Sequence, residues 1–213
     1  MSNRALVLLL IIAVAGGLGL LAARHFLGRP PAAAMPASRS ITMLPVPRVL
    51  PPFSLQQSDG TSLAAAELQG HWTLVFLGFT HCPDICPTTL ARLSVAQKQW
   101  RSLPAAARPR VLFVSVDPER DTPELAGQYA HGFDADTLAA TAPVRQLEGF
   151  TQSLSLVFVK SPGPAGRDDE YSIDHSAGFV LLDPDARMAG VIQPPFDIKT
   201  IASDLSALTK ANP

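Results

Sequence analysis

The sequence has no excess of charge of either sign and very little cysteine. Its 213 residues include 17 Lys and Arg against 18 Asp and Glu, for a formal net charge of -1. A nucleic-acid partner would need a basic face, so this charge balance argues against one. Only two cysteines are present, whereas a small secreted domain held together by disulfides needs more. Cys82 and Cys86 are therefore interpreted as one local site.

An apolar run without any charged residue occupies residues 5–23. At about 1.5 Å per residue, a helix of this length just spans a bilayer core of roughly 30 Å. A cleaved signal peptide is the alternative, because the alanines at 32–34 offer a cleavage site. The length of the run favours an uncleaved anchor, and no cysteine follows it to carry a lipid. Both interpretations place the rest of the chain across the membrane.

Seven prolines fall within residues 28–52. A segment so rich in proline forms neither a helix nor a central strand. We interpret its first part as a semi-rigid tether that gains about 3.1 Å per residue. The sequence thus divides into a transmembrane anchor or signal segment at 1–27, a proline-rich tether at 28–52 and a folded domain at 53–213.

Strand and helix patterns alternate along the folded domain. The nearly continuous apolar runs at 73–79 and 111–116 suit strands that are covered on both faces. Thr122-Pro123 is an N-cap followed by proline at the first helical position, which predicts a helix over 122–129. Further helices are expected at 88–103, 143–154 and 198–208, strands at 53–55 and 156–160, and a hairpin from 178–182 and 188–192. This order predicts an α/β, thioredoxin-like fold with a central mixed β-sheet flanked by helices.

Both cysteines lie in the stretch THCPDICP, residues 80–87, between a predicted buried strand and a helix. Because the residue before a proline avoids the α conformation, the regular helix is expected to begin at about Pro87. Both sulfurs would then lie beside free helix amides, which lower the pKa of a thiol. Four-residue spacing also permits a disulfide. The pair is therefore expected to form a reversible disulfide or to bind a soft metal, rather than to act as two small core residues.

A metal site in this geometry needs a third ligand, and imidazole suits the same soft ions as thiolate, Cu(I) and Zn(II). Of the five histidines, His175 is the best placed, because it comes just before the predicted strand at 178–182. In a thioredoxin-like fold, that loop faces the helix that carries the cysteines. A solvent-exposed histidine without a role is an equally good interpretation of His175 on these grounds alone.

Three motifs give the domain a resemblance to the Sco/SenC family of copper-binding thioredoxin-like proteins. They are FTHCPDICP at 79–87, VSVDPERDTPE at 114–124 and YSIDHSAGFVLLDPDARM at 171–188. The resemblance covers residues 52–208 and implies that Cys82, Cys86 and His175 bind copper, as Cu(I) and also as Cu(II). It further implies a role in assembling the dinuclear copper centre of cytochrome c oxidase.

Three aspartates fall within these motifs. By the same resemblance, Asp174 supports the site or a partner contact, and a loop-capping role fits it equally well. Asp117 and Asp121 are interpreted as turn and cap residues close to the site, because the sequences DPxxD and DTP are strong turn formers.

Two functions from different classes stay open. The first is a metallochaperone that delivers copper to the oxidase and is not formally an enzyme. The second is a thiol-disulfide oxidoreductase in which Cys82 attacks, Cys86 resolves, and the client is the cysteine pair of the oxidase copper site. Redox thioredoxins place two residues between their cysteines and this motif places three, which favours the metal. A peroxidase is weaker still, because no arginine is evidently placed to activate a cysteine.

The expected partners are the copper-bearing subunit of cytochrome c oxidase and other copper chaperones. The expected location is the bacterial inner membrane, with a single-pass anchor and a monomeric soluble domain in the periplasm.

Overall fold

The computed structural model describes residues 4, 12–19, 38–163 and 171–211. It separates into two compact units, Met1–Met35 and Pro36–Pro213. Residues 12–19 are helical, but none of the helices within the described ranges is long and apolar enough to cross a membrane. Most of the predicted anchor at 5–23 lies outside these ranges, so the anchor stays a prediction.

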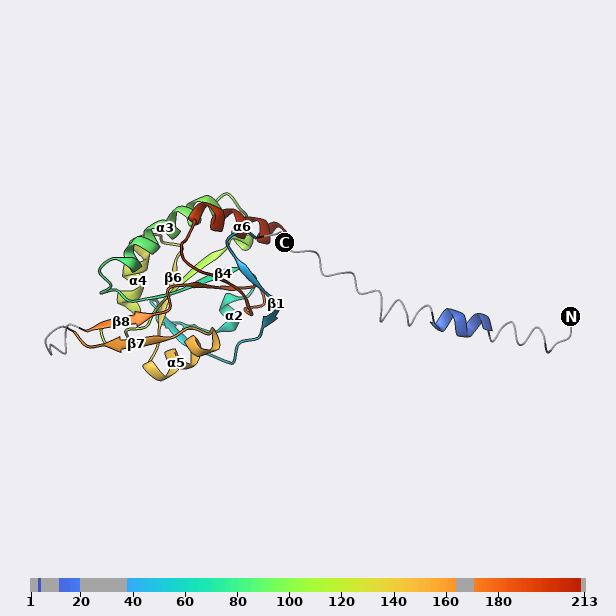
Figure 1. The fold of residues 1–213 in the computed structure, drawn as a ribbon, viewed down its shortest axis with the longest axis horizontal. Helices are drawn as coiled ribbons and strands as arrows, with labels where there is room; N and C mark the ends of the chain where they lie inside the picture. The colour runs from blue at the N-terminus through green and yellow to red at the C-terminus, as the bar shows by residue number, and fades with distance from the viewer. Residues whose placement is uncertain (1–3, 5–11, 20–37, 164–170, 212–213) are drawn as a thin grey trace. The chain divides into compact units, whose positions relative to one another are not determined.

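The second unit is built on an eight-stranded mixed sheet with the order β1-β10-β9-β4-β5-β6-β2-β3 (Figure 1). Strands β4, β5 and β6 run parallel to one another, and the remaining neighbours pair antiparallel. The strands are β1 Thr42–Arg48, β2 Leu55–Gln57, β3 Ser62–Leu63, β4 Thr73–Gly78, β5 Arg110–Ser115, β6 Leu138–Thr141, β9 Phe179–Leu182 and β10 Met188–Ile192.

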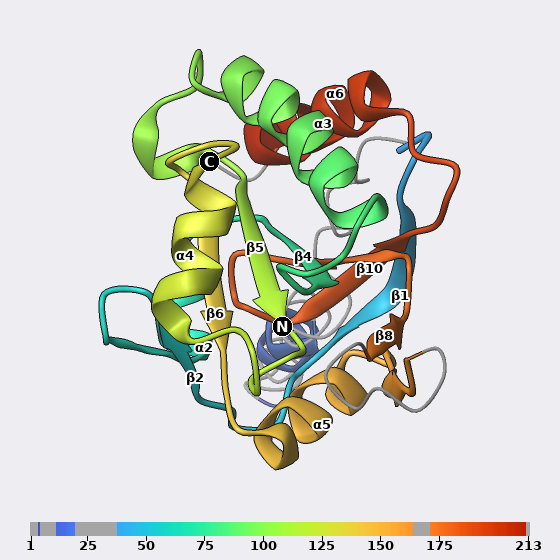
Figure 2. The ribbon, with the colours of Figure 1, turned by 90° about the vertical axis from the view of Figure 1, so that its left-hand side faces the viewer.

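Helices cover both faces of this sheet (Figure 2). They are α2 Ala65–Leu68, α3 Ile85–Trp100, the short 3₁₀ helix η1 Ala105–Ala107, α4 Pro123–His131, α5 Val144–Ser153 and α6 Ile198–Ala211. Leu74 and Phe76 of β4 pack in one apolar cluster with α3, α4 and α6, and Val75 and Leu77 pack in the other with α2 and α5. This burial on both faces explains the continuous apolar run of β4 and confirms the prediction of a mixed sheet flanked by helices.

The proline-rich segment contributes an edge strand to the sheet. β1 contains Pro45 and Pro47, and it pairs with β10 on one side only. An edge position tolerates proline because one side of the strand needs no donor. The folded unit therefore begins before residue 53, where the sequence placed the boundary.

Helix α3 begins earlier than the sequence indicated. Its N-cap is Asp84 and its first residue is Ile85, so Pro87 lies at the third helical position. Proline is tolerated in a first turn because the amides there have no partner within the helix. The expected start at Pro87 was therefore wrong by two residues, and Cys86 lies inside the first turn.

Two further strands form a separate small sheet. β7 Phe158–Ser161 pairs antiparallel with β8 Ser172–His175, and neither joins the central sheet. The sequence predicted a strand at 156–160 but placed His175 in a loop. The structure instead places His175 at the end of a strand, where its backbone is held by pairing with Phe158.

Candidate metal centre

The two cysteines lie where β4 passes into α3. A turn follows the strand, in which the Cys82 amide donates to the Phe79 carbonyl at 3.2 Å. The Cys86 amide, in the first turn of the helix, donates to the Cys82 sulfur at 3.4 Å. One helix amide that would otherwise lack a partner thus reaches a sulfur, as the position of the motif predicted.

Burial separates the two thiols. Cys82 is half-buried and Cys86 is completely buried, and both are free. Burial raises the pKa of the Cys86 thiol to about 12, so this cysteine keeps its proton at neutral pH unless a metal replaces it. The expectation that the helix terminus would lower its pKa was wrong, because the cost of placing charge inside the core outweighs the helix amides.

Gly78, the last residue of β4, makes room for the buried sulfur. A Cβ atom at this position would lie 3.0 Å from Cys86 Sγ and 2.7 Å from the Phe113 ring. Either separation is too short for an ordinary contact. A glycine is therefore what lets the strand, the Phe113 ring and the thiol share this space.

His175 points its ring at the buried cysteine. Nε2 of His175 lies 3.8 Å from Cys86 Sγ, and Nδ1 lies 3.1 Å from the Ser176 carbonyl. A carbonyl only accepts, so Nδ1 is assigned the proton and Nε2 keeps a lone pair directed at the sulfur. Burial lowers the pKa of His175, which favours the neutral imidazole that metals bind.

Two aromatic rings form the walls around His175. The centroids of Phe76 and Phe79 both lie 6.3 Å from that of the imidazole, edge to face. These edge-to-face contacts help to hold the imidazole in place.

The gap between Cys86 and His175 matches a bridging metal. With bonds of about 2.3 Å to sulfur and 2.0 Å to nitrogen, as in zinc sites, a trigonal angle separates the two donors by about 3.7 Å. The observed separation is 3.8 Å. Thiolate and imidazole donors suit Cu(I). The residues present thus fit a soft metal ion.

Cys82 is not yet placed to complete a set of three ligands. Within the described ranges, the only three His, Cys, Asp or Glu side chains with ligand atoms all within 4.8 Å of one another are His81, Asp117 and Asp121. Cys82, Cys86 and His175 do not meet this limit together, so the half-buried Cys82 has to approach the other two when a metal binds.

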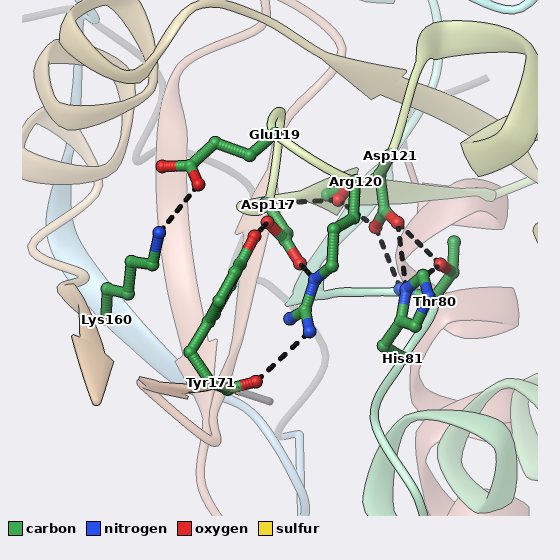
Figure 3. A network of polar contacts seen from close by, with 9 residues as sticks. Thr80, His81, Asp117, Glu119, Arg120, Asp121, Lys160 and Tyr171 are labelled. Atoms are coloured by element: carbon green, nitrogen blue, oxygen red, sulfur yellow. Dashed lines mark hydrogen bonds and ion pairs between the residues drawn. The ribbon is translucent and has the colours of Figure 1, made fainter. Parts of the chain in front are cut away.

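The cluster of His81, Asp117 and Asp121 is explained by protein contacts (Figure 3). Asp117 binds Arg120 and the Tyr171 hydroxyl, and Asp121 accepts hydrogen bonds from Thr80 and Ser115. These contacts occupy the carboxylates, which are 2% and 0% exposed.

The two aspartates close their turn as the sequence indicated, since the Asp121 amide donates to the Asp117 carbonyl at 2.8 Å. Their contacts with Thr80 and Tyr171 were missed. The sequence carried no signal for them, because only the fold shows that both carboxylates are buried and need donors from elsewhere in the chain.

Asp174 turns away from the centre. It is exposed, and its carboxylate accepts a hydrogen bond from Ser161 across the β7–β8 pair at 2.5 Å. Asp174 thus lies within strand β8 and makes a cross-strand contact, so the loop-capping role that the sequence left open is not what the structure shows.

Comparison with known proteins gives matches of three kinds. The SCO1/SenC family model matches residues 42–210. The chain is 37% identical over 133 residues to the mitochondrial SCO2 homolog of Bos taurus, covering 62% of this chain and 49% of that protein. It is 32% identical over 161 residues to a putative copper-binding protein of Stutzerimonas stutzeri, covering 75% and 76%.

Solved structures agree with these matches. The structure of Bradyrhizobium japonicum ScoI with copper bound is similar with a TM-score of 0.65 and 31% identity, over 74% of this chain and 98% of that one. The chain spans about half the length of the mitochondrial relatives that it matches.

Proposed function

The chain belongs to the SCO1/SenC family, and from this premise we propose that it is a copper metallochaperone. Cys82, Cys86 and His175 bind the copper, and the domain delivers it to the dinuclear copper site of cytochrome c oxidase. The observation that carries the proposal is the gap of 3.8 Å between Cys86 Sγ and His175 Nε2. A relative of the same fold has been solved with copper bound.

Copper uptake in this proposal exchanges a proton for a metal ion. The buried Cys86 gives up its proton only when the cation takes its place, and His175 is already in the neutral form with Nε2 free. Cu(I) suits two thiolates and an imidazole best, and Cu(II) is bound with less preference. The half-buried Cys82 is the ligand that an incoming thiol of a partner reaches first, so transfer begins there by ligand exchange.

The proposed partner is the copper-bearing subunit of the oxidase, with other copper chaperones as donors. The proposed location is the bacterial inner membrane, with the domain as a monomer in the periplasm. The support for this location is the uncharged run at 5–23, followed by a proline-rich tether.

Copper titration tests the proposal. The domain from Pro36 onward, reduced and anaerobic, is titrated with Cu(I) against a chromogenic chelator, for the native sequence and for His175→Ala. We expect one tightly held copper, weakened at least tenfold in the variant, which corresponds to about 1.4 kcal/mol. Equal and weak binding by both proteins would reject the three-ligand site.

A thiol-disulfide oxidoreductase is the second candidate. It is favoured by the position of Cys82, which is half-buried at the start of α3 and is the more accessible of the two thiols. The pKa of about 12 at Cys86 argues against it, because a resolving thiol must also ionise. His175 discriminates the two functions, since copper retention needs this imidazole and disulfide exchange does not.

A further inference from the structure

The loop between β5 and α4 contacts both halves of the candidate metal centre. We call residues 117–121, with the sequence Asp-Pro-Glu-Arg-Asp, the bracket loop. One of its aspartates holds the strand that carries His175, and the other holds the segment that carries the cysteines (Figure 3).

The first contact runs from Asp117 to Tyr171. The Tyr171 hydroxyl donates to Asp117 Oδ1 at 2.6 Å. Burial and this hydrogen bond both raise the pKa of Tyr171, so the hydroxyl stays a donor. Arg120 donates to the Tyr171 carbonyl at 3.1 Å and lies 3.6 Å above its ring. Tyr171 directly precedes β8, and His175 ends that strand.

A second cation covers the same ring. Lys160 of β7 lies 3.8 Å from the centroid of the Tyr171 ring, and its ammonium donates to Glu119 of the bracket loop at 2.6 Å. Both strands of the small sheet are therefore attached to the bracket loop at the end away from His175.

The other contact runs from Asp121 to Thr80. The Thr80 amide donates to Asp121 Oδ2 at 2.8 Å, and its hydroxyl donates to Oδ1 at 2.5 Å. Thr80 lies two residues before Cys82. Ser115, at the end of β5, binds the same carboxylate, so the cysteine segment is tied to the central sheet through Asp121.

The bracket loop is closed by contacts between its own residues. The Asp121 amide donates to the Asp117 carbonyl at 2.8 Å, and Arg120 Nε donates to the Asp117 carboxylate at 2.5 Å. Both aspartates are buried. A buried carboxylate that loses its partner is costly, so the loop keeps one arrangement.

We propose that the bracket loop sets the distance between His175 and the cysteines, with Asp117 and Tyr171 as the positioning residues for His175. This inference rests on the proposed copper function, because it assigns these residues to the third ligand. The small sheet shares no strand pairing with the central sheet. Tyr171 and Ile173 pack into the apolar core, and the bracket loop adds polar contacts at the end of the small sheet away from His175.

A double-mutant cycle tests the inference. Cu(I) affinity is measured by chelator competition for the native domain, Tyr171→Phe, His175→Ala and the double variant. Tyr171→Phe keeps the ring under Arg120 and removes only the hydroxyl. We expect it to weaken copper binding about tenfold in the native background and to cause no further loss once His175 is absent, because it acts through that imidazole. An equal loss in both backgrounds would overturn the inference.

A matched pair of aspartate variants separates positioning from stability. Asp117→Asn is compared with Asp134→Asn, since Asp134 is also buried and is bound by an arginine, Arg101, at 2.7 Å. Asp134 precedes the amino end of β6, whereas the cysteines follow the carboxyl end of the parallel strand β4, so the two lie at opposite ends of the sheet's parallel strands. We expect Asp117→Asn to weaken copper binding and Asp134→Asn to leave it unchanged. Equal effects of the two changes would contradict the positioning role.

If the native domain binds no copper, the proposed function is rejected. Nuclear Overhauser effects in the metal-free protein then still test whether the bracket loop positions His175. The effects between the rings of His175 and Phe79 are expected in the native domain and in Asp134→Asn, and are expected to be lost in Tyr171→Phe and Asp117→Asn. Their persistence in the latter two variants would overturn the inference whatever the copper result.

Discussion

Single atoms decide the geometry around Cys86. Its sulfur occupies space that opens only because Gly78 carries no side chain, and the Phe113 ring closes the same space from the next strand. The φ angle of Gly78 is not in the left-handed region. The requirement for glycine here is therefore one of room, not of backbone conformation.

Gly78→Ala is expected to destabilise the domain by about 1–3 kcal/mol, because the added methyl overpacks the core. It is also expected to weaken copper binding by displacing the Cys86 sulfur. Urea unfolding and the Cu(I) titration measure the two effects.

Gly149→Ala in α5 is the matched control, since a Cβ there meets nothing within 4 Å. It is expected to stabilise the domain by about 0.5–1 kcal/mol through helix propensity. Copper binding by Gly78→Ala as tight as that of the native domain would contradict the role given to Gly78.

At the scale of elements, helix α6 binds the segment that leads into the edge strand β1. The Asp204 carboxylate accepts four hydrogen bonds at 2.7–2.9 Å, from the side chain of Ser38, the amide of Arg39, and the amide and hydroxyl of Ser40. These residues lead directly into β1. One aspartate thus fixes the start of the edge strand.

Asp204→Ala is expected to lower the free energy of unfolding by about 1–3 kcal/mol at pH 7, because it leaves the donors of Ser38 and Ser40 without an acceptor. Burial acts to raise the pKa of Asp204, but the hydrogen bonds outweigh it and the pKa is lowered. Its stabilisation is therefore complete above the ordinary carboxyl pKa near 4 and is lost as the pH falls through the lowered value.

Unfolding midpoints of the native and Asp204→Ala domains, measured between pH 7 and pH 2, check this pH dependence. The difference between the two proteins should shrink at the acid end. A difference that stays constant over the whole range would contradict the assigned role of the carboxylate.

Local sequence patterns predicted the helices and strands that core burial and helix capping define. They did not predict features that depend on residues distant in the chain. The apolar run of β4 and the Thr122-Pro123 start of α4 were readable from the sequence, because burial and capping act over a few residues. The partner strand of β7, the contacts of Asp117 and the raised pKa of Cys86 were not readable. Each depends on residues far away in the chain that the fold brings together.

At the scale of the whole molecule, bound copper should appear as added stability. A ligand present at one hundred times its dissociation constant stabilises the folded state by about 2.7 kcal/mol. For a domain of this size, that is a rise in melting temperature of roughly 5–10 °C.

Calorimetry of the reduced domain, with and without Cu(I), measures this rise. We expect a smaller rise for His175→Ala and none when Cys82 and Cys86 are both replaced by serine. A full rise in the serine variant would place the copper elsewhere.

The small sheet of β7 and β8 forms no backbone pairing with the central sheet. Both cysteines lie where a strand of the central sheet passes into α3, whereas His175 ends a strand of the small sheet. A displacement of the β7–β8 hairpin alone would therefore separate the imidazole from the thiols and leave the thiol pair in place. On the proposed function, retention of the metal depends on the position of this one hairpin, whereas exchange of thiols does not.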